Sequence, residues 1–232
     1  MTFLQLAQRA ASECGVSLTG PSDTTGQSGR LGQIVKWVNA GWMDIQTKHD
    51  DWKWMRASFT VDTVAGDGKY LITDCTDVAT SAALTVAGFR CWVPETFKIY
   101  LASAGQATET DLDLIDYQHW YQRWNTGNQS DSYPTDFTID HDRGILLAPK
   151  PGDVYTVSGE YMKAATELSG DSDEPDMPAE YHMAIVYRAM MKYGRYNAAP
   201  EVFTDGQAEY TRMMREMSRT QRPAHLVGGA LA

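Results

Sequence analysis

The stretch that decides the fold begins Tyr155-Thr156-Val157-Ser158-Gly159-Glu160-Tyr161 and continues through an acidic loop into two methionine-rich segments that reach Pro223. Its first part alternates large or apolar residues with polar ones, and this period of two predicts a half-buried strand. In the methionine-rich segments the apolar residues recur at helical spacing instead. The change of period indicates a β region followed by two closing helices.

Prolines mark the starts of both closing helices. Pro178 and Pro200 suit the first helical position, where the N–H that proline lacks would have no partner in any case. The apolar face of the first helix is predicted at Met183, Val186 or Tyr187, Met190, and Tyr193 or Gly194, and that of the second at Phe203, Gln207, Tyr210, Met213, Met214 and Met217.

The N-terminal part is helical as well. Thr2 and Gln5 have the spacing of a capping box, and Gly15 ends this first predicted helix. The second helix carries an amphipathic stripe at Leu31, Ile34, Val35, Val38, Trp42 and Ile45. Trp37 lies off the stripe, so it either covers a neighbouring helix or contacts another subunit. The Ser-, Thr- and Gly-rich loop from Thr19 to Gly29 offers little to bury, so we expect it to be mobile or ordered only against a partner.

Between these helices a β region runs from about Met55 to Lys163. Period-two segments surround Phe59 and Phe97, and His141-Asp142-Arg143-Gly144 predicts a hairpin turn with Gly144 in the left-handed conformation. A short helix interrupts the strands, with Thr110 and Asp113 as caps and an apolar face at Leu114, Tyr117, Tyr121 and Trp124. The predicted fold class is α+β, a bundle of N- and C-terminal helices interrupted by an inserted antiparallel β domain. The predicted domains are a discontinuous bundle over 1–54 and 164–222, the insertion over 55–163, and an extension over 223–232.

Composition limits the possible functions. The formal net charge of −10 argues against binding DNA by neutralising its phosphates, although a ring of acidic subunits could surround a sliding duplex. Cys14, Cys75 and Cys91 have no CxxC spacing, so we expect buried free thiols in a reducing cytoplasm. We expect no signal peptide and no membrane span.

No catalytic or metal-binding pattern stands out. The acids at Asp171, Asp173 and Asp176 fail the EF-hand spacing because Asp176 replaces the required glycine and no glutamate closes the loop. The histidines show no metal-ligand spacing, and a GxSxG or Walker motif is absent from the sequence. The Tyr181-His182 pair is more typical of packed or hydrogen-bonded groups than of a catalyst. We therefore expect no catalytic residue, cofactor or metal, although paired carboxylates of a glycosidase would leave no local motif.

A series of short motifs runs along most of the sequence: Ile34 to Trp42, Asp44-Ile45-Gln46, Trp52 to Met55, Gly144 to Pro149, Gly159-Glu160-Tyr161, Asp173-Glu174-Pro175, Met177-Pro178, Tyr181-His182 and Ile185-Val186-Tyr187. In their order these motifs resemble bacteriophage head-to-tail adaptor (connector) proteins. The resemblance implies a structural virion protein that docks beneath the portal ring as a homo-oligomeric ring, a dodecamer. It also implies that viral DNA passes through the channel and that the ring offers a platform to further tail or nozzle proteins.

The resemblance also implies that the C-terminal extension reaches into the portal. The portal-facing candidates are Arg219, Arg222, Pro223, His225, Leu226 and Val227. The segment from His225 to Ala232 has no period and cannot bury its apolar residues locally, so it either fills a slot on a partner or is disordered. We expect the protein at the head–tail junction of a virion, after assembly in the host cytoplasm.

Two other functions remain open on the sequence. A carbohydrate- or receptor-binding β-sandwich would expose Trp52, Trp54, Trp92 or Trp120 for stacking on sugars. A wall-degrading enzyme would depend on specific carboxylates. The carbohydrate- or receptor-binding alternative gives no role to the helices that flank the β region.

Overall fold

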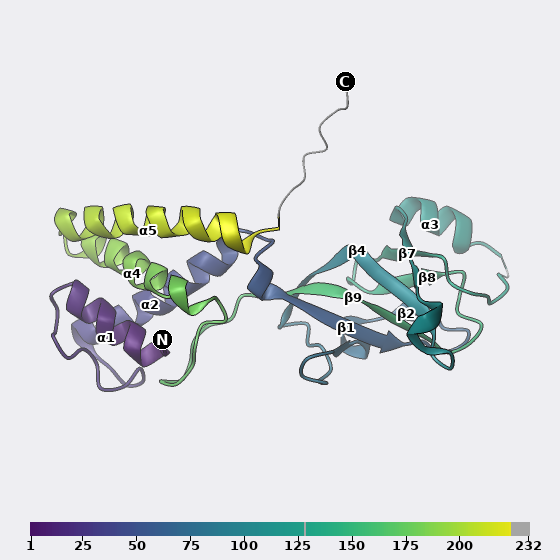
Figure 1. The fold of residues 1–232 in the computed structure, drawn as a ribbon, viewed down its shortest axis with the longest axis horizontal. Helices are drawn as coiled ribbons and strands as arrows, with labels where there is room; N and C mark the ends of the chain where they lie inside the picture. Colours follow the sequence, from purple (N-terminus) through teal and green to yellow (C-terminus); the bar gives the residue numbers. More distant parts are fainter. Residues whose placement is uncertain (128, 224–232) are drawn as a thin grey trace, which may run out of the picture. The chain divides into compact units, whose positions relative to one another are not determined.

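The computed structural model describes residues 1–127 and 129–223, which form two compact units. The first, here called the helical unit, comprises Met1–Met55 and the described chain from Ala165 onwards. The second, the β unit, is Arg56–Ala164. Helices at both ends of the chain with sheets between them confirm the predicted α+β class (Figure 1).

The helical unit consists of long helices and two short 3-10 turns. These are α1 (Phe3–Glu13), α2 (Gly29–Lys48), η1 (Lys53–Met55), η4 (Ala179–Tyr181), α4 (Met183–Tyr196) and α5 (Pro200–Gln221). Thr2 and Gln5 form the predicted capping box of α1, and Pro200 starts α5 as expected. The α2 stripe is buried from Ile34 to Ile45. Helix α4 lies at the centre because it contacts α1, α2 and α5.

Two close contacts determine how α4 packs. Trp37 of α2 lies edge-on to Tyr193, with ring centroids 6.0 Å apart, and also contacts Tyr196. Trp37 therefore covers a neighbouring helix, the first of the two predicted roles. At Gly194 a Cβ atom would lie 2.8 Å from the backbone nitrogen of Phe203 in α5. Only glycine allows this approach of the two helices.

The loop before α2 is ordered by contacts within the chain. The backbone N–H and the hydroxyl of Thr24 donate to Asp171 Oδ1 at 2.7 and 2.5 Å. The backbone of the same acidic segment accepts the N–H groups of Phe3 and Leu4 at the start of α1. The prediction that this loop is mobile or needs a partner to order it is wrong, because a carboxylate 147 residues away supplies the contact.

The β unit contains two sheets. One has the order β3-β1-β9-β4-β5 and the other β2-β8-β7-β6. Their strands are β1 (Arg56–Asp62), β2 (Lys69–Tyr70), β3 (Thr76–Asp77), β4 (Phe89–Leu101), β5 (Thr110–Asp111), β6 (Asp113–Leu114), β7 (Asp136–Ile139), β8 (Ile145–Ala148) and β9 (Tyr155–Lys163). The other elements are η2 (Ile72–Asp74), η3 (Gly105–Thr108) and the helix α3 (Tyr117–Trp124). Neighbouring strands run antiparallel except β6 and β7, which pair in parallel.

An aromatic cluster fills the core of the β unit. Phe97 stacks on Phe137 with centroids 4.6 Å apart and meets Phe59 and Trp92 edge-on. Gly159 of β9 makes room for these rings, since a Cβ there would lie 2.7 Å from Phe97 Cδ1. Gly159 therefore allows the aromatic rings to pack directly against β9.

The β7–β8 turn differs from the prediction. In the β7–β8 turn the positive φ, 62°, belongs to Arg143 and not to Gly144. The Arg143 carbonyl accepts a hydrogen bond from Trp92 Nε1 at 2.7 Å, which holds this conformation. Gly144 is needed for space, because a Cβ would lie 3.2 Å from the Tyr70 carbonyl oxygen.

The start of α3 also differs from the prediction. Asp116 caps the helix by accepting from the N–H groups of Gln118 and His119. Thr110 and Asp113, the predicted caps, belong to strands β5 and β6. Asp116 lies directly before the first helical residue, where a carboxylate reaches the free N–H groups.

The cysteines divide into two environments. Cys14 and Cys75 are buried as predicted, and burial raises the pKa of both thiols to about 12. Cys91 is exposed on β4, so the prediction of burial is wrong for it. An exposed thiol on a strand follows from the alternation of side chains, because Trp92 takes the buried position.

Candidate interaction surfaces

The C-terminal end of α5 is tied to the rest of the helical unit by three polar contacts. The guanidinium of Arg222 forms a bidentate ion pair with the Asp51 carboxylate, with Nε 2.8 Å from Oδ1 and Nη2 3.0 Å from Oδ2. The hydroxyls of Thr220 and Tyr181 lie 2.8 Å apart, and Lys53 Nζ donates to the Thr220 carbonyl oxygen at 2.9 Å. Hydrogen bonds from Arg222 hold the pKa of Asp51 below its ordinary value. These contacts fix the point at which the chain leaves α5.

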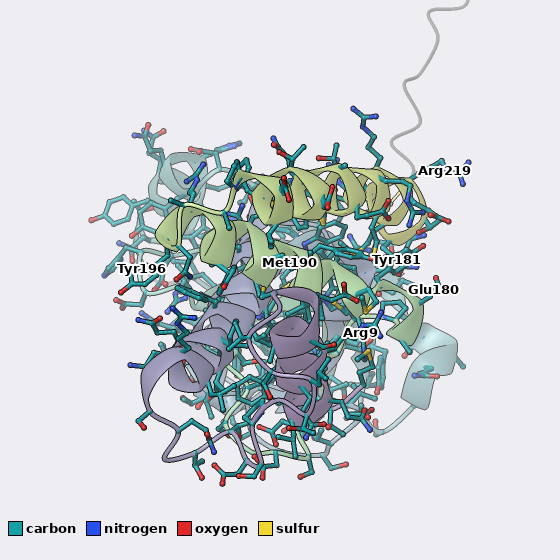
Figure 2. All side chains as sticks on the ribbon, turned by 90° about the vertical axis from the view of Figure 1, so that its left-hand side faces the viewer. Arg9, Glu180, Tyr181, Met190, Tyr196 and Arg219 are labelled. Atoms are coloured by element: carbon teal, nitrogen blue, oxygen red, sulfur yellow. The ribbon has the colours of Figure 1, made fainter. Side chains whose placement is uncertain are left out.

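The outer face of α5 is open and basic towards its C-terminal end. It bounds a shallow hollow of ≈ 840 Å³ whose lining includes Arg212, Arg215 and Arg219. Arg212 pairs with Glu209 at 2.8 Å. Arg215 and Arg219 make no ion pair with any residue that the structure describes, so their charges remain available to a partner. Figure 2 shows Arg219 near the end of the helix.

The six predicted portal-facing residues have different environments. Arg219 is exposed, whereas Arg222 is half-buried and engaged by Asp51. Pro223 is half-buried directly after it. His225, Leu226 and Val227 lie outside the described residues. Sequence reasoning missed Asp51, Lys53 and Tyr181 as the residues that hold this end, because their partners are distant along the chain.

His182, beside Tyr181, has a structural environment. Its side chain is buried, Nδ1 accepts from the Met1 amine at 2.7 Å, and Nε2 lies 3.0 Å from the Met177 carbonyl oxygen. Because the amine can only donate, Nε2 carries the ring proton and donates it to Met177. Burial lowers the pKa of His182 and so favours the neutral ring. This matches the predicted hydrogen-bonded role.

The lowered pKa of His182 predicts a pH-dependent stability. The unfolded histidine takes up a proton near its ordinary pKa of about 6.5, while the native ring resists protonation. The free energy of unfolding should therefore fall as the pH drops from about 7.5 to 5.5. Denaturant titrations of wild type, His182→Gln and His141→Gln should show a weaker pH dependence in the first variant alone. An unchanged dependence in His182→Gln would remove this residue as the cause.

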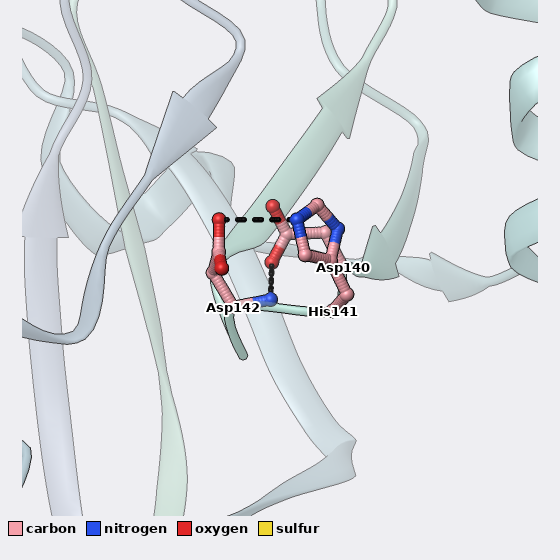
Figure 3. Close-up of side chains that lie close together, drawn as sticks. All are labelled: Asp140, His141 and Asp142. Carbon is pink, nitrogen blue, oxygen red and sulfur yellow. Dashed lines mark hydrogen bonds and ion pairs between the residues drawn. The ribbon is translucent and has the colours of Figure 1, made fainter.

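Among the described residues, Asp140, His141 and Asp142 form a cluster with the donor types of a metal site (Figure 3). Lys69 already holds a positive charge there, with Nζ 2.5 Å from Asp140 and 3.2 Å from Asp142. Asp140 Oδ1 also accepts the N–H groups of Asp142 and Gly144. Burial opposes ionisation of Asp140, but Lys69 and these N–H groups outweigh it and lower its pKa. The cluster therefore stabilises the β7–β8 turn.

Helix α3 is unusual for its exposed aromatic side chains. Half of its residues are Tyr117, Trp120, Tyr121 and Trp124, yet none of its residues is buried. Tyr121 is 52% exposed. By contrast Trp52 and Trp92, two of the rings considered for sugar stacking, are buried in the cores of their units.

A cavity of ≈ 360 Å³ adjoins α3 in the β unit. Trp120 and Trp124 line it together with Asp67, Asp131 and Lys150, and residues of β8 close one side. The indole N–H groups of both tryptophans are shielded from water and have no hydrogen-bond acceptor among the described residues. The arrangement of rings and charges suits binding of another molecule rather than packing alone.

The helices of the described chain include none that is both long and apolar enough to cross a membrane. The fold and surfaces define an α+β protein in which a β unit interrupts the chain of a helical unit that carries a basic helix end.

A family model described as SU10 adaptor protein matches residues 1–228. The chain belongs to this family of phage head-to-tail adaptors, which are structural proteins of the virion. A comparison with curated proteins found no significant match.

Proposed function

We propose that this adaptor docks as a ring beneath the portal of a phage head, extends the DNA channel and gives tail components a platform. The observation that carries the proposal is the family match over residues 1–228. The helical unit supplies the ring, a dodecamer, and the β unit is an inserted domain. DNA passes through without sequence-specific contacts, which agrees with the net charge of −10. Assembly takes place in the host cytoplasm.

The C-terminal end of α5 and the extension after it form the portal contact in this proposal. Arg219 offers an uncompensated charge on the open face, and Arg222 holds the end of the helix to Asp51. The portal surface that meets Arg215 and Arg219 is then expected to present carboxylates.

Native mass spectrometry of the chain, alone and mixed with the portal protein of the same phage, tests the proposal. A complex of fixed ring stoichiometry is expected. Absence of a complex at micromolar concentrations would contradict it and would make a glycan screen for a carbohydrate-binding module the next step.

A chain truncated before Ala224 should keep its circular dichroism spectrum and lose portal binding. Unchanged binding would move the portal contact away from the extension.

The Arg222–Asp51 pair allows positioning to be separated from direct contact. If Arg222 acts by holding the end of α5, Asp51→Asn and Arg222→Gln should weaken portal binding to a similar extent, because either change breaks the bidentate pair. Arg219→Gln should weaken binding without changing hydrogen exchange at the end of α5. Surface plasmon resonance on immobilised portal measures the first effect and exchange mass spectrometry the second. Full binding by Asp51→Asn beside weak binding by Arg222→Gln would instead identify Arg222 as a direct contact.

A further inference from the structure

We propose that the aromatic helix α3, together with the cavity beside it, binds a segment of another virion protein that carries Lys or Arg among apolar residues. The inference rests on the proposed adaptor function, which requires a surface for tail components in addition to the one for the portal. It assigns that surface to the β unit and identifies the chemistry of its partner.

The first argument is the cost of exposing the rings of α3. Tyr117 and Tyr121 are 39% and 52% exposed, and Leu114, just before the helix, is 52% exposed. Tyr117 stacks on Trp120 with centroids 6.2 Å apart, so the outward rings are continuous with those that line the cavity. Tyrosine and tryptophan are enriched in the parts of interfaces that contribute most to binding energy. This eight-residue helix therefore has the composition of a binding surface.

The second argument is a negative edge beside α3, formed by Asp113 and Asp136. Asp113 of β6 and Asp136 of β7 are partners in register, which places two carboxylates next to each other on neighbouring strands. Like charges in this position destabilise a sheet. No cation among the described residues forms an ion pair with either of the two. A positively charged partner would relieve this repulsion.

The charge of the whole β unit agrees with a basic partner. Residues 56–164 contain fifteen Asp and Glu but only eight Lys and Arg. In the cavity, Lys69 is engaged by Asp140 and Asp142, and the other lysine of the lining, Lys150, shares it with Asp67 and Asp131. The Arg123 guanidinium lies 5.0 Å from the centroid of the Trp124 ring, so this ring makes a cation–π contact within the chain.

The test is an array of overlapping peptides that covers the tail proteins of the same phage, probed with the full chain. Wild type should bind peptides that combine Lys or Arg with apolar residues, and binding should weaken as salt is raised. Trp120→Ala should weaken the best peptide at least about tenfold. Tyr196→Ser, which changes an exposed tyrosine of the helical unit, is the matched control for Tyr121→Ser and should bind normally.

A second variant distinguishes a role in peptide binding from a merely structural role. Asp136→Asn removes the repulsion with Asp113, so it should raise the melting temperature of the free chain while weakening peptide binding several-fold.

Equal binding by wild type and Tyr121→Ser, or a preference for acidic peptides, would overturn the inference. So would a glycan ligand that is lost in Trp120→Ala, because the cavity would then belong to a sugar. Portal binding, measured on the same variants, should be unchanged, so failure of the portal assay in wild type refutes the adaptor role separately.

Discussion

Gly194→Val is expected to destabilise the helical unit severely, by about 3 kcal/mol or more. The new side chain would begin 2.7–2.9 Å from Cβ, N and Cα of Phe203, and two of these atoms are backbone. This clash is therefore relieved only if α4 moves away from α5. This separation would expose Met190 and Met214, which are buried in the helical unit. Hydrogen exchange followed by mass spectrometry should show faster exchange in both helices.

The control for this prediction is the neighbouring residue. Arg195→Val introduces the same β-branched residue at an exposed position of α4 and should cost less than about 1 kcal/mol. Exchange in the β unit should remain at the wild-type rate in both variants. Equal destabilisation by the two substitutions would show that helix propensity, and not the close approach of α4 and α5, decides the outcome.

Phe97→Ala should have the largest effect in the β unit, about 3–5 kcal/mol. The ring is 1% exposed and contacts the rings of Phe59, Trp92 and Phe137, so its removal leaves a cavity between the two sheets. Near-ultraviolet circular dichroism and denaturant titration of the full chain measure the loss of packing and of stability.

Val154→Ala serves as the comparison for Phe97→Ala, since this side chain is 45% exposed and should tolerate truncation. The close contact between Gly159 and the Phe97 ring gives a further test of this packing. Gly159→Ala alone should destabilise the β unit, and Phe97→Leu should recover part of that loss because a shorter side chain frees the space. Strictly additive effects would mean that the two positions do not compete for this space.

Patterns that act within a few residues of sequence predicted the helices well. The capping box at Thr2, the stripe on α2 and the proline at the start of α5 each depend on neighbours along one element. Alternation around Phe59 and Phe97 likewise predicted strands, because one face of each is buried. The α+β class followed from these local periods.

Contacts between distant residues could not be predicted. Thr24 and Asp171 are 147 residues apart, and Arg222 and Asp51 are 171 apart. The positive φ of Arg143 depends on a hydrogen bond from Trp92, which no turn rule contains. At the candidate portal contact, sequence identified Arg219 and Arg222 but not the carboxylate that holds Arg222. Composition suggested aromatic contact surfaces but did not single out α3, since buried and exposed rings look alike in sequence.

Strands β1 and β9 have a consequence for how this protein can evolve. The chain enters the β unit at Arg56 and leaves it near Met162, and these two residues are partners across one pair of strands. A loop of the helical unit could therefore accept or lose the whole insertion as a cassette, with its two ends already side by side. Phages could exchange such cassettes while the helical unit stays the same.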